Sequence, residues 1–388
     1  MFPTLTLSGE PFARGLECGR AARTQIAGSI RCYAALFAAC GVDWRHAQQR
    51  AAQYRDIVEG CGGGIIEEIE GLATGSGFHV NEILALNCRT EILPPSFLGM
   101  DYPDSAQARS RNAAMGLFDL GECTSVAVSG ERTADGHTRV AQNWDWVGFQ
   151  RANVIVLRVE REGWPDYLTL TEAGIIAKIG VNEHGLAVGL NILRARNDRD
   201  QPGIPVHIFQ RMALDCANVE DVVSLANSLQ FAASSNAILG DPSGHVTSLE
   251  YSPSGAAAIG PDDGVVAHTN HFCDGRLATW QAPLAQMLTT EPRLDCANRH
   301  IVSWPDHIDD VDLAALLRDE SGVGTAPGVE ARLGAVCRHP DPSAPPELRV
   351  ESIFGVIIDC NARCMLVAPG LPSAVDFEAV ALSRSPGA

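Results

Sequence analysis

The sequence predicts an α+β protein in which antiparallel sheets carry helices on their outer faces. Three observations lead to this class. The first 93 residues have a helical period, the pattern changes near residue 124 to short strands joined by tight turns, and a further helical segment separates two groups of strands. Helices and strands therefore come in runs rather than in strict alternation, which disfavours a doubly wound parallel sheet.

The N-terminal segment is expected to be helical throughout. Apolar side chains recur at the spacing of one helix face at Ile26, Ile30 and Tyr33. Three further helices are predicted from WRHAQQRAAQYRDIVEG, GIIEEIEGLA and VNEILALNCRTEIL. Residues 94–122 are rich in Pro, Ser, Ala and Gly and have no period, so they predict a long exposed loop.

Strands dominate the rest of the chain. TSVAVSG and TRVAQNWDW flank Asp135-Gly136, a strong hairpin signal. A helix is predicted from Val206 to Gln230, and helical patches are predicted from 276 to 335. The remaining strands are expected at ANVIVLRVER, YLTLTEAG, AKIGVNE, GLAVGLNIL, SNAILGDPSG, HVTSLEYSP, GAAAIG, GVVAHTN, ESIFGVIIDC and CMLVAPG.

Composition narrows the class of protein. The chain has 388 residues, of which 46% are hydrophobic and 20% charged, which is typical of a globular protein with a sizeable core. Its net charge of −18 argues against nucleic acid or an anionic membrane as a partner. We see no apolar run long enough to span a membrane and no secretory signal. Twelve scattered cysteines without a CxxC pair predict reduced thiols in a cytoplasmic protein, with no metal and no cofactor.

Cys123 stands where the long loop ends and the first strand begins, which indicates self-processing. The thiol would attack the carbonyl carbon of Glu122, and hydrolysis of the resulting thioester would leave Cys123 with a free α-amine. Such an amine has a pKa of about 8, so it can accept the thiol proton and no histidine partner is needed. The hairpin brings Asp145 beside Cys123 as the nearest acidic side chain of the partner strand, about 10 Å away or less.

ECTS followed by AQNWDW resembles the acyl-coenzyme A:6-aminopenicillanic acid acyltransferase family, also called isopenicillin-N acyltransferases, which are N-terminal-nucleophile hydrolases. GEPFARGLECGR, EEIEGLATGSGFHVNEILALNCRTE, VNEHGLAVGLNIL, SSNAILGD, HTNHF and SIFGVIID match the family in the same order. The resemblance implies a four-layer αββα sandwich of antiparallel sheets. It divides one composite domain into a helical α chain, residues 1–122, that ends in a processing loop, and a β chain, residues 123–388, that carries the nucleophile and most of both sheets.

The resemblance also implies roles for individual residues. Cys123 is the nucleophile and its α-amine is the base. Asp145 matches the catalytic aspartate of the N-W-D motif, Asn236 in SSNA matches an asparagine of the oxyanion hole, and Arg338 in AVCRHP matches an arginine near the nucleophile. The chain departs from the family at Glu122, where a small residue or aspartate is expected before the cysteine.

Other residues leave more than one interpretation. Arg89 and Glu91 form either a buried structural pair or, with Asn270, part of a substrate-binding cleft. His268, His271 and Cys273 in HTNHFC suggest zinc, but on a continuous strand 271 and 273 would face together while 268 faces away. We therefore expect a structural role there.

The function predicted from these observations is an autoproteolytically activated N-terminal-cysteine amidohydrolase or acyltransferase. It would cleave or transfer the acyl group of a small linear amide, or of another acyl donor, through a thioester on Cys123. One alternative is an N-acyltransferase that uses acyl-coenzyme A. A second is a non-catalytic or zinc-stabilised binding protein, and a third is a conventional Cys–His enzyme that uses His268 or His271.

Overall fold

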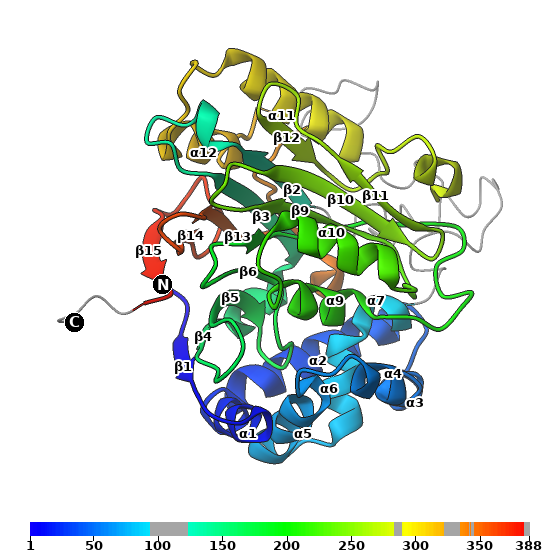
Figure 1. Cartoon of the computed structure of the whole chain (residues 1–388). Helices are drawn as coiled ribbons and strands as arrows, with labels where there is room; N and C mark the ends of the chain where they lie inside the picture. Colours follow the sequence, from blue (N-terminus) through cyan, green and yellow to red (C-terminus); the bar gives the residue numbers. More distant parts are fainter. Residues whose placement is uncertain (94–122, 283–288, 322–333, 341, 343–344, 384–388) are drawn as a thin grey trace, which may run out of the picture.

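The computed structural model describes residues 1–93, 123–282, 289–321, 334–340, 342 and 345–383. Two sheets face each other, and helices cover both outer faces (Figure 1). This arrangement confirms the predicted four-layer αββα class. The predicted loop at 94–122, including Glu122, lies outside the described residues.

The N-terminal segment is mostly helical, as predicted, but it begins with a strand. β1 (Thr4–Leu7) pairs with β4 (Val154–Val159), and the pairing is parallel. The predictions of an entirely helical start and of purely antiparallel sheets are therefore wrong at this edge. The helices that follow are α1 (Pro11–Ala21), α2 (Arg23–Ala39), α3 (Trp44–Ala52), α4 (Arg55–Gly60), α5 (Ile65–Ser76), α6 (Val80–Asn87) and α7 (Arg89–Ile92).

The larger sheet lies next to these helices, and its strand order is β1-β4-β5-β6-β7-β9-β10-β11, with β8 paired to β9. Among the described residues, the strands of this sheet pair antiparallel, apart from β1 with β4. Its other strands are β5 (Tyr167–Glu172), β6 (Ile179–Asn182), β7 (Ala187–Val188), β8 (Asn191–Ile192), β9 (Ser235–Gly240), β10 (Val246–Ser252) and β11 (Gly255–Ile259).

The smaller sheet has the order β12-β2-β3-β13-β14-β15. The expected hairpin forms its centre, and Cys123 stands opposite Trp144. The connection between the two strands is longer than a two-residue turn, because a short 3₁₀ segment precedes Asp135-Gly136. The strands are β2 (Cys123–Val128), β3 (Arg139–Val147), β12 (Val265–His268), β13 (Val350–Asp359), β14 (Cys364–Ala368) and β15 (Glu378–Ala381), the last of which was not predicted.

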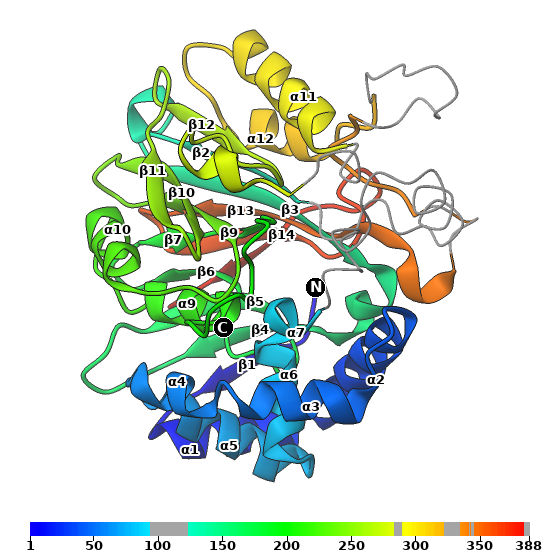
Figure 2. The same ribbon diagram turned by 90° about the vertical axis from the view of Figure 1, so that its right-hand side faces the viewer.

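Helices cover the outer faces of both sheets. The predicted helix from Val206 to Gln230 is divided into α9 (Val206–Ala213) and α10 (Val219–Ser228). Asn218 caps α10 by accepting a hydrogen bond from the Asp221 amide at 2.9 Å. On the far side, α11 (Thr290–Ser303) and α12 (Asp310–Leu317) cover the smaller sheet (Figures 1 and 2).

Side chains of β2 alternate between the core that lies between the two sheets and the cluster beneath α11 and α12. Val126 and Val128 join the cluster beneath α11 and α12, whereas Ala127 joins the main core between the sheets. Cys123 belongs to the same main core. The period of two in the sequence thus places the proposed nucleophile between the two sheets rather than under α11.

No single helix in the described part of the chain has both the length and the apolar character of a membrane span. α2 and α3 have this length and apolar character only when they are taken together, and the chain bends by 103° between them.

Candidate active site

Cys123 is held by side chains through both of its backbone groups. The partner strand β12 ends at His268, opposite Ser125, so no strand runs beside Cys123 on that edge. Instead, Oδ1 of Asn270 accepts the Cys123 backbone N–H at 2.7 Å, and Nη1 of Arg293 donates to the Cys123 carbonyl oxygen at 2.7 Å. These contacts orient the nitrogen that cleavage before Cys123 would release as an amine.

Arg293 is a buried residue of α11 that connects three parts of this site. Besides the Cys123 carbonyl, Nη1 donates to Oγ1 of Thr124 at 3.0 Å, and Nη2 donates to Oδ1 of Asn270 at 2.9 Å. Sequence reasoning missed this residue, because TEPRLDC carries no motif. The available signal was positional: Arg293 lies three and four residues before Cys296 and Ala297, on the buried face of the helix.

Asn270 was predicted to bind substrate, and the structure places its side chain against the backbone of Cys123. Its Oδ1 is shared between Cys123 and Arg293, while its Nδ2 donates to the Ile192 carbonyl at 2.9 Å. Its backbone N–H donates to Oγ1 of Thr290 at 2.8 Å. Both ends of the amide are thus engaged in positioning Cys123.

The thiol of Cys123 is fully buried, and burial raises its pKa to about 12. The negative charge of Asp145 raises this pKa further, whereas a hydrogen bond from the Asp145 backbone and the charges of Arg293 and Lys178 lower it. The thiolate is therefore scarce at neutral pH in the intact chain. A base close to the sulfur is needed before this residue can act as a nucleophile.

Asp145 lies on β3 between two buried tryptophans. Its Oδ1 accepts a hydrogen bond from Oγ of Ser352 at 2.6 Å. Ser352 Oγ also accepts the backbone N–H of Arg338 at 2.8 Å. Asp145 and Arg338, distant in the sequence, are therefore joined through one serine, and the Asp145 backbone contacts the Cys123 sulfur.

Asn236 reaches Cys123 through a second asparagine. Its Nδ2 donates to Oδ1 of Asn191 at 3.0 Å, and Nδ2 of Asn191 donates to the Cys123 carbonyl at 3.3 Å. On its other side, Oδ1 of Asn236 accepts from Oγ of Ser248 at 2.7 Å. This chain fixes the orientation of the Asn236 amide, and Asn191 is a member that sequence reasoning did not single out.

A buried group of charges lies close to the Cys123 strand. Nζ of Lys178 bonds to Glu172 and lies 4.0 Å from the ring centroid of Trp144, the residue opposite Cys123. Burial lowers the pKa of Lys178 to about 7, and Arg89 lowers it further, whereas Glu172 raises it. Amine, guanidinium and carboxylate therefore share one dry environment beside the nucleophile.

Arg89 and Glu91 point to different partners rather than to each other. The Arg89 guanidinium carbon lies 4.3 Å from the ring centroid of Trp146, and its Nε and Nη2 meet no acceptor in the described part of the chain. Glu91 accepts the N–H of Val206 at 2.9 Å through Oε1. Burial raises the pKa of Glu91 to about 7. The interpretation of a simple buried ion pair is not what the geometry shows.

The two histidines considered as bases for Cys123 make their hydrogen bonds elsewhere. The ring nitrogens of His268 lie 2.8 Å from Glu250 Oε1 and 2.8 Å from the Thr269 carbonyl. Nδ1 of His271 lies 2.9 Å from Oγ1 of Thr290. Because these ring nitrogens are already in hydrogen bonds, the geometry favours a base other than histidine for the Cys123 thiol.

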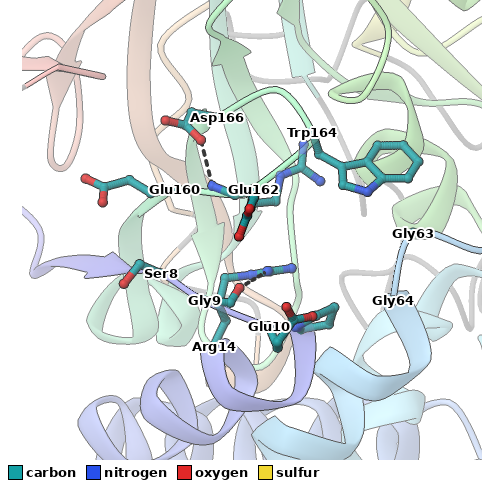
Figure 3. Close-up of a pocket in the computed structure, with 12 residues that line it drawn as sticks. Ser8, Gly9, Glu10, Arg14, Gly63, Gly64, Glu160, Glu162, Trp164 and Asp166 are labelled. Atoms are coloured by element: carbon teal, nitrogen blue, oxygen red, sulfur yellow. Dashed lines mark hydrogen bonds between the residues drawn. The ribbon is translucent and has the colours of Figure 1, made fainter.

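A separate pocket of 590 Å³ opens near the start of α1, where the β4–β5 connection meets β1 (Figure 3). Arg14 donates to the Gly9 carbonyl there at 2.5 Å, and Asp166 accepts the Arg161 backbone N–H at 2.6 Å. Its lining contains none of the predicted site residues. The pocket is therefore distinct from the predicted site around Cys123.

Comparison with known proteins agrees with the motifs. The model of the acyl-coenzyme A:6-aminopenicillanic acid acyl-transferase family matches residues 132–324. The acyl-coenzyme A:6-aminopenicillanic-acid-acyltransferase 40 kDa form of Emericella nidulans is 29% identical over 377 residues, which cover 96% of this chain and 94% of that protein. The chain is therefore similar to this family over nearly its whole length. The resemblance inferred from ECTS, AQNWDW and the motifs around them is thereby confirmed.

Solved structures with some similarity include a hydrolase and an acylase. A mutant of conjugated bile acid hydrolase from Clostridium perfringens is 12% identical, with a TM-score of 0.43, over 67% of this chain and 92% of that chain. Penicillin V acylase from Agrobacterium tumefaciens is 17% identical, with a TM-score of 0.42, over 63% and 82% of the two chains.

Proposed function

We propose that the chain is an N-terminal-cysteine amidohydrolase or acyltransferase that acts on a linear amide through a thioester on Cys123. The observation that supports this most directly is the double anchoring of Cys123 at the start of β2, by Asn270 on its nitrogen and by Arg293 on its carbonyl. A structural cysteine needs neither contact. An N-terminal nucleophile needs both, because its amine must stay beside its own sulfur.

Activation begins with the bond between Glu122 and Cys123. The sulfur attacks the Glu122 carbonyl carbon, a C–S bond forms, the C–N bond breaks, and the nitrogen takes up a proton. Water then hydrolyses the thioester and returns the thiol. Residues 1–122 and 123–388 become two chains that remain associated, and Cys123 gains a free α-amine.

Turnover uses the new amine as a base. The amine accepts the thiol proton while the sulfur attacks the substrate carbonyl, and the same proton passes to the leaving amine as the C–N bond breaks. Water attacks the acyl thioester in hydrolysis, whereas an amine attacks it in acyl transfer. We favour hydrolysis, since water is the abundant nucleophile and the chain's charge of −18 does not favour the phosphates of an acyl-coenzyme A donor.

Asn236 is proposed to stabilise the oxyanion of this step. Its amide is oriented by Asn191 on one side and Ser248 on the other, which suits a donor that must not reorganise during reaction. Asn236→Leu is expected to lower kcat by roughly 10²- to 10³-fold with a small change in KM, as expected for the loss of one oxyanion donor. Ser248→Ala, which keeps the amide but frees its orientation, should give a smaller loss. Equal kcat in Asn236→Leu and the parent would exclude this role.

The buried charges near Trp144 and Trp146 are proposed to bind the polar end of the substrate. Arg89 has N–H groups without an acceptor among the described residues, and Lys178 and Glu172 lie close by. A carboxylate on the substrate would satisfy Arg89. The substrate class that we expect is therefore a small N-acyl amine or amino acid.

Mass spectrometry of the denatured protein tests the proposal. Active material should contain two chains, one of them beginning Cys-Thr-Ser-Val, and incubation with a panel of N-acyl amines and acyl-coenzyme A should add an acyl mass to the Cys123 chain. Cys123→Ala should remain uncleaved and unmodified. Turnover by an intact chain, or by Cys123→Ala, would exclude this mechanism.

A further inference from the structure

Three side chains near Cys123, which come from two separate segments, form a cluster that the proposed reaction does not use. They are Glu250 on β10, His268 at the end of β12 and Cys273 five residues later. The expectation that His268 faces away from Cys273 is wrong, because β12 ends at His268 and the chain then turns. One ligand atom of each of the three side chains lies within 4.8 Å of the others.

The histidine in this cluster is oriented as metal-binding histidines are. Its Nδ1 lies 2.8 Å from the Thr269 carbonyl, which favours a proton on Nδ1 and leaves Nε2 to face the cluster. Nε2 lies 2.8 Å from Oε1 of Glu250. At this distance the two groups share a proton, and a metal ion that replaced the proton would bond to both atoms once they separated to about 3 Å or slightly more.

Cys273 supplies the soft ligand of the set. The backbone N–H groups of Cys273 and Asp274 both donate to Glu250, at 2.5 and 3.1 Å, which holds the loop against the carboxylate. Sγ of Cys273 lies 3.9 Å from Nε2 of His271. Ligand atoms around tetrahedral Zn²⁺ stand about 3–4 Å apart, given metal–ligand bonds of about 2.0–2.3 Å.

The cluster differs from a similar one at Cys296, His300 and Asp319 in the solvent accessibility of its cysteine. Cys296 is buried, and burial raises the pKa of its thiol to about 11. Cys273 is exposed. A metal ion can therefore reach Cys273 from solvent, whereas Cys296 is closed off from it.

We propose that Glu250, His268 and Cys273 bind a thiophilic divalent cation of the Zn²⁺ type, with His271 or water as the fourth ligand. Binding releases to solvent both the proton between His268 and Glu250 and the thiol proton of Cys273, and the ion forms bonds to nitrogen, oxygen and sulfur. Carboxylate, imidazole and thiolate are the protein ligands that Zn²⁺ uses. No step of the amide chemistry passes through this ion.

The location of the site connects it to the nucleophile. Asn270 lies between His268 and Cys273, and its side chain holds the Cys123 nitrogen. His271 and Asn270 also share Thr290 of α11, the helix that carries Arg293. A bound ion would therefore hold the segment that positions the nucleophile.

Equilibrium dialysis of the full chain against Zn²⁺, followed by metal analysis, tests this proposal independently of turnover. We expect one Zn²⁺ per chain in the parent and in Cys123→Ala, and at least about tenfold weaker binding in Cys273→Ser. Co²⁺ in place of Zn²⁺ should give a thiolate charge-transfer absorption that survives Cys123→Ala and Cys296→Ser but not Cys273→Ser. Full Zn²⁺ binding by Cys273→Ser, or its loss in Cys296→Ser or in Cys123→Ala, would overturn the assignment.

A second measurement needs no substitution. Zn²⁺ should protect Cys273, and not Cys364, from alkylation in the parent chain, as read from the masses of the two peptides. Equal labelling of Cys273 with and without Zn²⁺ would contradict the proposal.

Discussion

At the scale of single residues, the backbone of Cys123 is held by neutral amides and by one buried cation. Asn191, Asn236 and Asn270 surround the backbone of Cys123 directly or through one another. Amides donate and accept without changing charge, so they orient the nucleophile at any pH at which the protein is folded. The cation is Arg293, whose planar fork serves several acceptors at once.

The substitution Arg293→Lys tests whether the several hydrogen bonds of the guanidinium are needed for cleavage. A lysine keeps the charge but cannot serve Cys123 and Asn270 together. We expect cleavage before Cys123 to slow roughly 10- to 100-fold, since a hydrogen bond to a charged group contributes about 1.5–3 kcal/mol. The new N-terminus is followed over time by mass spectrometry. Arg299→Lys, exposed on the same helix, is the matched control, and equal rates in the two variants would contradict the role.

The Glu172–Lys178 pair makes stability depend on pH. Burial lowers the pKa of Lys178 below its ordinary value, so between that pKa of about 7 and the unfolded value of about 10.4 the unfolded chain binds more protons. The protein therefore becomes more stable as pH rises through this range, because the cost of burying a protonated lysine disappears. Glu172→Gln removes the partner that raises this pKa.

Urea denaturation measures the cost of that substitution. We expect Glu172→Gln to lose about 3–5 kcal/mol of unfolding free energy, because it leaves a buried charge unpaired. The loss should be larger at about pH 6 than at about pH 9, where the lysine is neutral. The double variant Glu172→Gln/Lys178→Met should recover most of the loss, and a deficit independent of pH would contradict this account.

At the scale of elements, the close approach of α1 and α5 explains why glycines stand at the contact between these two helices. A Cβ at Gly15 would lie 2.0 Å from the Glu68 carbonyl oxygen, and one at Gly71 would lie 2.2 Å from the Phe12 carbonyl oxygen. Each helix therefore needs glycine where the other helix touches it. The G-x-x-x-G pattern of GEPFARGLECGR is a packing requirement and not a ligand site.

Gly15→Ala is expected to destabilise the protein by about 1–3 kcal/mol, the usual cost of overpacking, because the obstacle is backbone and cannot rotate away. Chemical denaturation gives the value. Gly60→Ala, at the end of α4, meets nothing within 4 Å and should be neutral or slightly stabilising. Equal stabilities for the two variants would show that the helices move apart at no cost.

At the scale of the whole molecule, the proposed cleavage would break the chain but leave the contacts between its two parts in place. β1 pairs with β4, and the Asn87 side chain donates to the Gly174 carbonyl at 2.8 Å and accepts from the Ile176 N–H at 3.1 Å. These contacts join segments on opposite sides of Cys123. They do not depend on the peptide bond before it.

The two chains should therefore stay together after processing. Native mass spectrometry is expected to show one particle that contains residues 1–122 and 123–388, and denaturant should release two masses. Separation of the fragments by size exclusion in plain buffer would contradict this prediction. Uncleaved Cys123→Ala is the control, with a single mass under both conditions.

The sequence predicted the β2–β3 hairpin more accurately than it predicted the helices. The period of two and the turn residues predicted β2 and β3, because those signals are local and both strands are nearly complete within about 25 residues of Cys123. The long helical stretch from Val206 was predicted as one helix, and the strand β1 was missed. Both depend on packing against distant parts of the sheet, which local periodicity does not record.

By itself, the sequence determined the resemblance to a known family, the four-layer class and the position of Cys123 at the start of a strand, because these follow from local pattern and from motifs in order. Only the tertiary structure decided what holds that cysteine. Arg293 is 170 residues from Cys123 and Asn270 is 147 residues away, and no period links them to it. They meet Cys123 because β12 ends before it reaches the level of Cys123 and α11 packs across the gap, which is a consequence of how the layers stack and not of any one segment.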